Sequence, residues 1–153
     1  MGDQSAPLLD AVRACVFALS ERLFAIDLGR VRGVRRFETP TRVPRAPAHL
    51  IGMINVHGSI VPLLDSRRLL GFPAQEAGRP AEAVVLAWES MQVAMTVDHV
   101  LGLEALDASA RAEAPDASTF ASGMVRRGDG WIEMLDVSRI VRSLAPSGVP
   151  ITD

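Results

Sequence analysis

The sequence contains no lysine and no tyrosine, and its 153 residues include a single cysteine, Cys15. One cysteine cannot form an internal disulfide, which is typical of proteins kept in a reducing compartment. No apolar run approaches the roughly 20 residues that a membrane-spanning helix needs. The N-terminal residues also lack the basic and apolar regions of a signal peptide. We therefore expect a cytoplasmic protein that is not inserted into a membrane.

Residues that could form a catalytic or metal centre are also sparse. The three histidines, His49, His57 and His99, lie far apart and have no cysteine or acidic partner at the spacing of metal ligands. Asp65 and Asp136 each precede a short helical pattern, so a helix cap is the simpler interpretation of both. We expect no enzyme activity, no metal and no cofactor. The alternative is a hydrolase or small-ligand enzyme that uses Asp65 or His57.

Charge is distributed unevenly along the chain. Residues 1–75 contain ten arginines and six acidic residues, whereas residues 76–153 contain six arginines and twelve acidic residues. Such a dipolar surface suits protein partners, although two ordinary solvated faces explain it equally well. The basic stretch from Arg30 to Arg45 raises nucleic acid as an alternative partner. Only Phe37 offers an aromatic ring nearby and the chain is acidic overall, so we expect no nucleic-acid binding.

The sequence repeats itself at a spacing of about 70 residues. Residues 25–34 and residues 94–103 both read Ala, a large apolar residue, four residues, Val, one residue, Gly and an apolar residue. Gly-Met at position 52 recurs at position 123, and Leu-Asp at position 64 recurs at position 135. These matches predict an internal duplication into two similar units of about 70 residues each.

Both copies have the pattern of short β-strands. The segments with strand periodicity or with apolar runs of strand length are residues 15–19, 23–28, 59–65, 83–88 and 91–97. Hairpin turns are expected at residues 20–22 and 89–90, and Pro62 indicates an edge or a bulge. Helix is limited to one turn at residues 66–70 and a C-terminal helix at residues 137–144. We predict an all-β fold with one short C-terminal helix, arranged as small barrels or a sandwich.

Residues 52–67 carry a recognisable motif, Gly-Met-Ile-Asn-Val-His-Gly-Ser-Ile-Val-Pro-Leu-Leu-Asp-Ser-Arg. It resembles the core motif of the CheW family, which runs Gly, two variable residues, Asn-Leu-Arg-Gly, two variable residues, Val-Pro, two aliphatic residues and Asp-Leu-Arg. The segment upstream of the motif and residues 84–144 are also similar to that family. The resemblance therefore covers roughly residues 14–144, which is nearly the whole chain.

The resemblance implies two interlocked, pseudo-repeated SH3-like barrels of five strands each. We expect one CheW-like domain at residues 14–144, with a first subdomain at about 14–71, a second at about 81–144, and flexible tails at 1–13 and 145–153. The resemblance further implies a non-catalytic adaptor in chemosensory signal transduction, associated with membrane receptor arrays. Its partners would be the regulatory domain of a CheA-type histidine kinase and the cytoplasmic tip of a chemoreceptor.

Nine residues are candidates for forming or supporting these partner-binding surfaces. They are Val31, Gly33, Val34, Arg35, Gly52, Asn55, His57, Gly58 and Val61. For Gly52 and Val61 a purely structural interpretation, as turn and core residues, is strong.

Two of these positions depart from the family pattern. The family usually has Arg where this chain has His57, and often has Glu where this chain has Gly33. In the family these two side chains pair across the sheet, and here both are missing, so no charge is left unpaired. We expect an intact fold with altered coupling. The alternative function is thus a divergent CheW-like scaffold in another pathway, such as motility or development, with altered or single partner binding.

Overall fold

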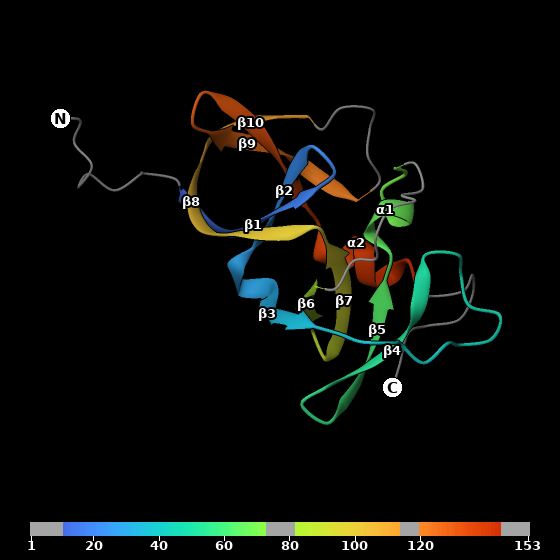
Figure 1. Ribbon diagram of the computed structural model, residues 1–153. Coiled ribbons are helices and arrows are strands. Elements are labelled where there is room, and N and C mark those ends of the chain that lie inside the picture. Colours follow the sequence, from blue (N-terminus) through green and yellow to red (C-terminus); the bar gives the residue numbers. More distant parts are fainter. Residues whose placement is uncertain (1–10, 73–81, 114–119, 145–153) are drawn as a thin grey trace.

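The computed structural model describes residues 11–72, 82–113 and 120–144, so residues 1–10 of the predicted N-terminal tail and the predicted tail at 145–153 lie outside the described residues. Each sequence copy forms five strands followed by a short helix (Figure 1). The first copy consists of β1 (Ala11–Leu19), β2 (Arg22–Asp27), the 3-10 turn η1 (Leu28–Arg30), β3 (Val31–Arg36), β4 (Leu50–Val56), β5 (Ser59–Leu64) and α1 (Ser66–Leu69). The second copy consists of β6 (Glu82–Trp88), β7 (Met91–Val97), β8 (His99–Ala112), β9 (Ala121–Arg127), β10 (Gly130–Leu135) and α2 (Val137–Arg142).

The ten strands form two five-stranded sheets that exchange their first hairpins. One sheet, which we call the barrel, is closed and has the order β1-β2-β10-β9-β8; the other, the open sheet, has the order β3-β6-β7-β5-β4. Each exchanged hairpin pairs with its sheet on both sides: β1 antiparallel to β8 and β2 parallel to β10 in the barrel, and β6 antiparallel to β3 and β7 parallel to β5 in the open sheet. The two sheets therefore cut across the predicted subdomains at 14–71 and 81–144, because the β1–β2 hairpin of the first copy completes the second.

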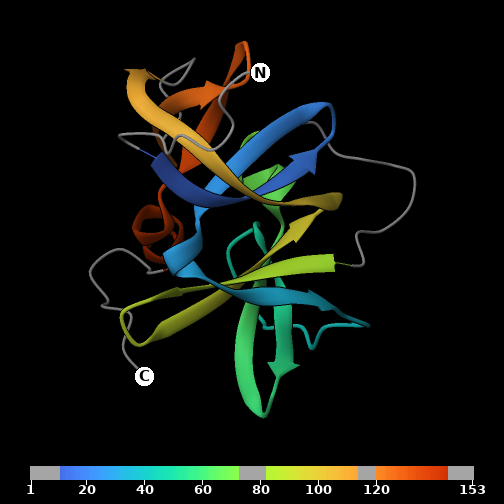
Figure 2. The same cartoon turned by 90° about the vertical axis from the view of Figure 1, so that its left-hand side faces the viewer.

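Burial on both faces explains why these hairpins lie at the centre of the molecule. β1 is buried without interruption from Ala14 to Leu19, and β7 from Val93 to Val97. A strand covered on both sides reads as a continuous apolar run instead of an alternating one. One face lines the interior of its own sheet, and the other joins the largest core cluster, where Phe17 and Phe24 pack with Met95 and with Ile140 of α2. Figure 2 shows the barrel above, the open sheet below and α2 beside their junction.

The barrel closes and the open sheet does not, although the two copies are similar. β8 runs for 14 residues and pairs with β9 after an irregularity between Asp107 and Arg111. The equivalent chain after β3 contains three prolines within residues 40–47, which cannot donate to a ladder. There only Thr41 pairs, as an isolated bridge with Met53. The all-β fold of two five-stranded units is confirmed, with one of them open between β3 and β4.

Local signals in the sequence agree with the structure at the helix starts and the turns. Asp65 accepts hydrogen bonds from the first backbone N–H groups of α1, and Asp136 does so for α2. The predicted turns at Ser20 and Glu89 join β1 to β2 and β6 to β7, and both residues adopt positive φ. α2 ends at Arg142, two residues before the predicted end.

Two strand predictions need adjustment. β1 begins at Ala11, so residues 11–13 lie in a strand that pairs with β8 instead of in the predicted tail. Pro62 lies in a strand between two neighbours, not at an outer edge, but β5 pairs with β7 only at Leu63 and Leu64. The half of β5 that contains Pro62 is therefore paired on one side only, which is where a missing N–H is tolerated. None of the helices in the described part of the chain is long and apolar enough to cross a bilayer.

Candidate partner-binding surface

The β4–β5 hairpin projects from the body of the molecule in both views (Figures 1 and 2). Its turn consists of two residues, His57 and Gly58, between the paired Val56 and Ser59. Both turn residues have positive φ, 51° and 88°, which is the geometry of a type I′ hairpin. Asn55 accepts a hydrogen bond of 3.0 Å from the Gly58 N–H through its side-chain oxygen. Three of the candidate residues thus shape one tight turn at an exposed tip.

β3 lies beside β6 at the edge of the open sheet and carries four further candidates. Its exposure alternates, so Val31, Gly33 and Arg35 are half-buried while Val34 is exposed. The pairing with β6 shifts between Val31 and Gly33, and Gly33 has a φ of 152°. A side chain added at Gly33 would meet nothing within 4 Å. The bulge is therefore a place where β3 leaves open space beside its neighbours.

Arg35 and His57 join β3 to the hairpin. Nη1 of Arg35 lies 2.9 Å from Nε2 of His57. An arginine can only donate, so Nε2 of His57 accepts in this contact and the matching tautomer carries its ring proton on Nδ1. The sequence predicted that no pair would cross the sheet here, because both usual partners are absent. The structure instead places a contact between His57 and a residue two positions beyond Gly33.

A small hollow of about 170 Å³ lies next to this contact. Its walls come from β3, from the hairpin and from the central strands β6 and β7. The lining residues are Arg32, Gly33, Arg35, Val56, His57, Ser59, Val85 and Gln92. Three of the candidates, Gly33, Arg35 and His57, are thereby brought into one concave site.

Gly52 and Val61 lie inside the molecule instead of on this surface. Val61 is buried in the core of the open sheet, where it packs with Val56 and Leu63. Gly52 is buried in β4, and a Cβ there would lie 2.5 Å from the carbonyl oxygen of Thr41. Both residues can support the surface, but neither can contact a partner directly.

Exposed apolar side chains accompany the candidates. Val34 is 43 % exposed on β3, and Ile60, which was not predicted, is 63 % exposed on β5. The sequence held a signal for Ile60, because in an alternating strand the neighbour of a buried Val61 faces the other way. Together with the hollow, these side chains give β3 and the β4–β5 hairpin the mixed character of a protein-binding surface. We call this set of residues on β3 and the hairpin the β3–hairpin surface.

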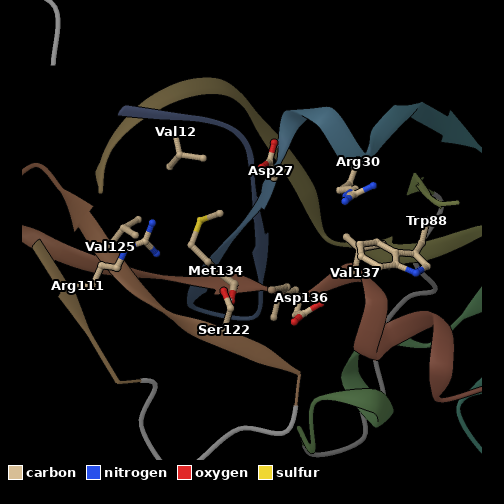
Figure 3. Close-up of a pocket in the computed structure, with 11 residues that line it drawn as sticks. Val12, Asp27, Arg30, Trp88, Arg111, Ser122, Val125, Met134, Asp136 and Val137 are labelled. Atoms are coloured by element: carbon tan, nitrogen blue, oxygen red, sulfur yellow. The ribbon is translucent and has the colours of Figure 1, made fainter. Parts of the chain in front are cut away.

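A second concavity, of about 270 Å³, lies between the barrel and the open sheet (Figure 3). Arg30 and Trp88 form one end, with the guanidinium 4.2 Å from the indole centroid, and Arg111 lies at the other end. Asp136 lines it as well while capping α2. Burial acts against ionisation of Asp136, but hydrogen bonds from Ser138 and the Arg139 N–H outweigh it and lower the pKa of the carboxyl. We call this concavity the junction groove; its walls come from both sheets, and none of the nine candidate residues lines it.

The remaining reactive side chains are not gathered into a centre. Cys15 is buried in β1, and desolvation raises the pKa of its thiol, which suits a structural residue. Across residues 11–72, 82–113 and 120–144, no three histidine, cysteine or acidic side chains are grouped so as to hold a metal ion.

Comparison with known proteins gives a consistent result. The family model of the CheW-like domain matches residues 13–145. The chain is 22 % identical over 152 residues to the chemotaxis protein CheW of Bacillus subtilis (strain 168), covering 95 % of this chain and 97 % of that protein. It is 31 % identical over 84 residues to the chemotaxis protein CheW of Rhizobium meliloti (strain 1021), covering 55 % and 54 %.

A solved structure shares the fold. The scaffolding protein TtCheW from Thermoanaerobacter tengcongensis superposes with a TM-score of 0.73 at 22 % identity, over 82 % of this chain and 88 % of that one. This likeness agrees with the two SH3-like units that the sequence resemblance implied. With a family model that spans nearly all of the described strands, the chain belongs to the CheW-like domain family.

Proposed function

We propose that this protein is a non-catalytic adaptor that couples chemoreceptors to a CheA-type histidine kinase in a chemosensory complex. The observation that carries the proposal is its membership of the CheW-like family over residues 13–145. Relatives with this domain are named chemotaxis proteins, and the structural neighbour is named a scaffolding protein. An adaptor works through geometry, by holding two proteins close together.

The β3–hairpin surface is our candidate for docking the regulatory domain of the kinase. It combines a tight, well-defined turn with exposed Val34 and Ile60, and such apolar anchors dominate the energetics of most interfaces. Gly52 and Val61 hold it from behind, because they pack β4 and β5 onto the chain around Thr41 and onto the core.

The junction groove is our candidate for the receptor tip. It lies where η1 and the start of α2 meet the two sheets, which is where an elongated helical hairpin could contact both units at once. Arg30, positioned over the ring of Trp88, provides a cation beside a broad apolar face at one end. A protein that binds in this way would reside in the cytoplasm at the receptor arrays.

Co-sedimentation tests the proposal with matched variants. The purified chain should sediment with receptor-bearing membranes, and should carry the kinase down with them. Val34→Asp should abolish recovery of the kinase, whereas Val43→Asp should not, because Val43 has a similar exposed fraction of 37 % but lies outside the β3–hairpin surface. Absence of the native chain from pellets that contain both partners would remove the proposal.

A second candidate function keeps the fold and changes the partner. The Arg35–His57 contact replaces the pair that the family usually has, and this difference lies on the proposed docking surface. The chain would then serve a divergent scaffold in another pathway, such as motility or development, with one partner altered. Recovery of a defined non-chemotaxis partner by affinity purification, without any CheA-type kinase, would favour this candidate.

A further inference from the structure

The hollow beside Gly33 is lined by two arginines and by no carboxylate. Arg32 and Arg35 line it from β3, and none of the residues that line it is acidic. The hydrogen bonds that Arg32 forms go to the backbone carbonyls of Gly29 and Val31, and Arg35 donates to His57. Within the described residues, neither guanidinium belongs to an ion pair.

In the second copy, the equivalent position carries an acidic side chain that is paired with an arginine. In the duplication, Glu104 on β8 is the counterpart of Arg35 on β3. Glu104 forms a bidentate pair with Arg127 of β9, with both distances at 2.9 Å. That pair lowers the pKa of Glu104 through the side-chain hydrogen bond from Arg127, against a smaller effect of burial. In the first copy the charged side chains of the corresponding strand, β3, are all positive, and the acid is missing.

The shape of the hollow suits a side chain entering from outside. Gly33 leaves its Cβ direction empty, and the buried side chains of Val56 and Val85 line the hollow from the hairpin and from β6. Arginine presents several N–H groups in a planar fork that matches a carboxylate. Because His57 accepts from Arg35, it also keeps an N–H on Nδ1 as a further donor.

We propose that this hollow receives the carboxylate of an aspartate or glutamate side chain of the docking protein, with Arg35 and Arg32 as its cationic partners. The inference rests on the proposed function, since it assigns the chemistry of the partner at the β3–hairpin surface. A relative with both an acidic and a basic side chain at this position would pair them within its own chain. This chain instead lacks the acid, so the docking protein must supply it. Gly33, Arg35 and His57 therefore select for a partner with an acidic residue facing β3.

Binding of purified partners tests the inference. Affinity for the kinase regulatory domain and for the receptor tip is measured at low and high salt, for the native chain, Arg35→Gln and the control Arg42→Gln. Arg42 is an exposed arginine of the same charge outside the hollow. We expect Arg35→Gln to weaken binding of the kinase regulatory domain by at least about tenfold and to reduce the salt dependence of that binding. Arg42→Gln should leave affinity within about twofold of native, and thermal unfolding confirms that both variants fold.

Charge exchange locates the acid on the partner. Arg35→Glu should abolish binding, and a partner variant with one acidic residue changed to arginine should restore it. Unchanged affinity and salt dependence of Arg35→Gln, with a native chain that does bind, would overturn the inference and leave the proposed function standing.

A titration with small molecules tests the carboxylate site separately from the proposed function, for the case in which no partner protein binds. Nuclear magnetic resonance follows the amides of Gly33 and Gly58 during titration with N-acetyl-glutamate amide, and with the neutral N-acetyl-glutamine amide as control. Shifts that appear with the glutamate compound alone, and vanish in Arg35→Gln, support a carboxylate site even where the proposed function fails. Equal shifts with both compounds, or tighter binding of a DNA duplex through Arg32 and Arg35, would overturn it.

Discussion

Nη2 of Arg67 donates a hydrogen bond of 2.6 Å to Oδ2 of Asp98, although 31 residues separate them in the chain. Arg67 lies in α1, which follows β5 of the open sheet. Asp98 lies between β7 of the open sheet and β8 of the barrel. The same carboxylate accepts from the Ser20 N–H at 2.6 Å, and the Arg67 guanidinium also donates to the Ser20 hydroxyl. This contact therefore joins the β1–β2 turn, the β7–β8 junction and α1, and ties the exchanged hairpins to each other.

Removal of this junction should destabilise the whole domain. Arg67→Gln loses a charge-assisted pair whose side chains are only 12 % and 27 % exposed, so we expect unfolding free energy to fall by about 1–3 kcal/mol. The matched control is Arg68→Gln, because Arg68 is 62 % exposed and lies 3.9 Å from Asp65. That variant should change stability by less than about 0.5 kcal/mol in urea denaturation. Equal losses in both would show that the Arg67 link is not structural.

Gly52→Ala should be damaging although Gly52 adopts no unusual backbone conformation. The added Cβ would lie 2.5 Å from the backbone oxygen of Thr41, so the backbone at Thr41 or at Gly52 must move. We expect a loss of about 1–3 kcal/mol and weaker protection of the Thr41 and Met53 amides in hydrogen exchange. Gly130→Ala serves as control, since its nearest atom is 3.9 Å away. A stable Gly52→Ala with native exchange would contradict this packing.

Acidification should weaken the domain through His49. This side chain precedes β4 and lies 3.1 Å from the Ser143 hydroxyl at the end of α2. Burial lowers the pKa of His49, against the opposing effect of its hydrogen bond with Ser143. The unfolded chain then binds more protons than the folded one, so stability is complete above about pH 7 and is lost as pH falls through the folded pKa.

His49→Gln is the test of this linkage. The native protein should lose stability as the pH falls below the usual histidine pKa of about 6.5, and the variant should lose less over the same range, because glutamine does not titrate. Urea unfolding at a series of pH values measures both. Parallel pH profiles for the two proteins would contradict a role for His49.

Ile60 and Leu103 distinguish the two copies as docking surfaces. They are exposed to nearly the same extent, 63 % and 60 %, on β5 of the first copy and β8 of the second. Ile60→Asp should weaken binding of the kinase regulatory domain by at least about tenfold, as expected for an apolar anchor, whereas Leu103→Asp should leave it near native. Isothermal titration calorimetry gives both affinities. A larger loss in Leu103→Asp would move the kinase site to the barrel.

The site was partly accessible from the sequence, because several of its parts are local. The motif around Asn55 and Gly58 placed residues 52–67 in the CheW-like family, whereas β4 and the turn at His57 and Gly58 were not predicted. Burial of Val61 and the exposure of Ile60 follow from simple alternation. The Arg35–His57 contact did not follow, because the bulge at Gly33 sets which residue of β3 faces the turn.

By itself the sequence determined the duplication, five of the ten strands, the helix caps at Asp65 and Asp136 and the family. All of these depend on residues close together in the chain, or on patterns that repeat along it. The tertiary structure alone decided the exchange of hairpins, the closure of one sheet and the link from Arg67 to Asp98. Those features depend on which apolar face each hairpin buries. Because the two copies are similar, no local pattern distinguishes pairing within one copy from pairing with the other. Only the packing of the complete chain, with prolines blocking closure in the first copy, selects one arrangement.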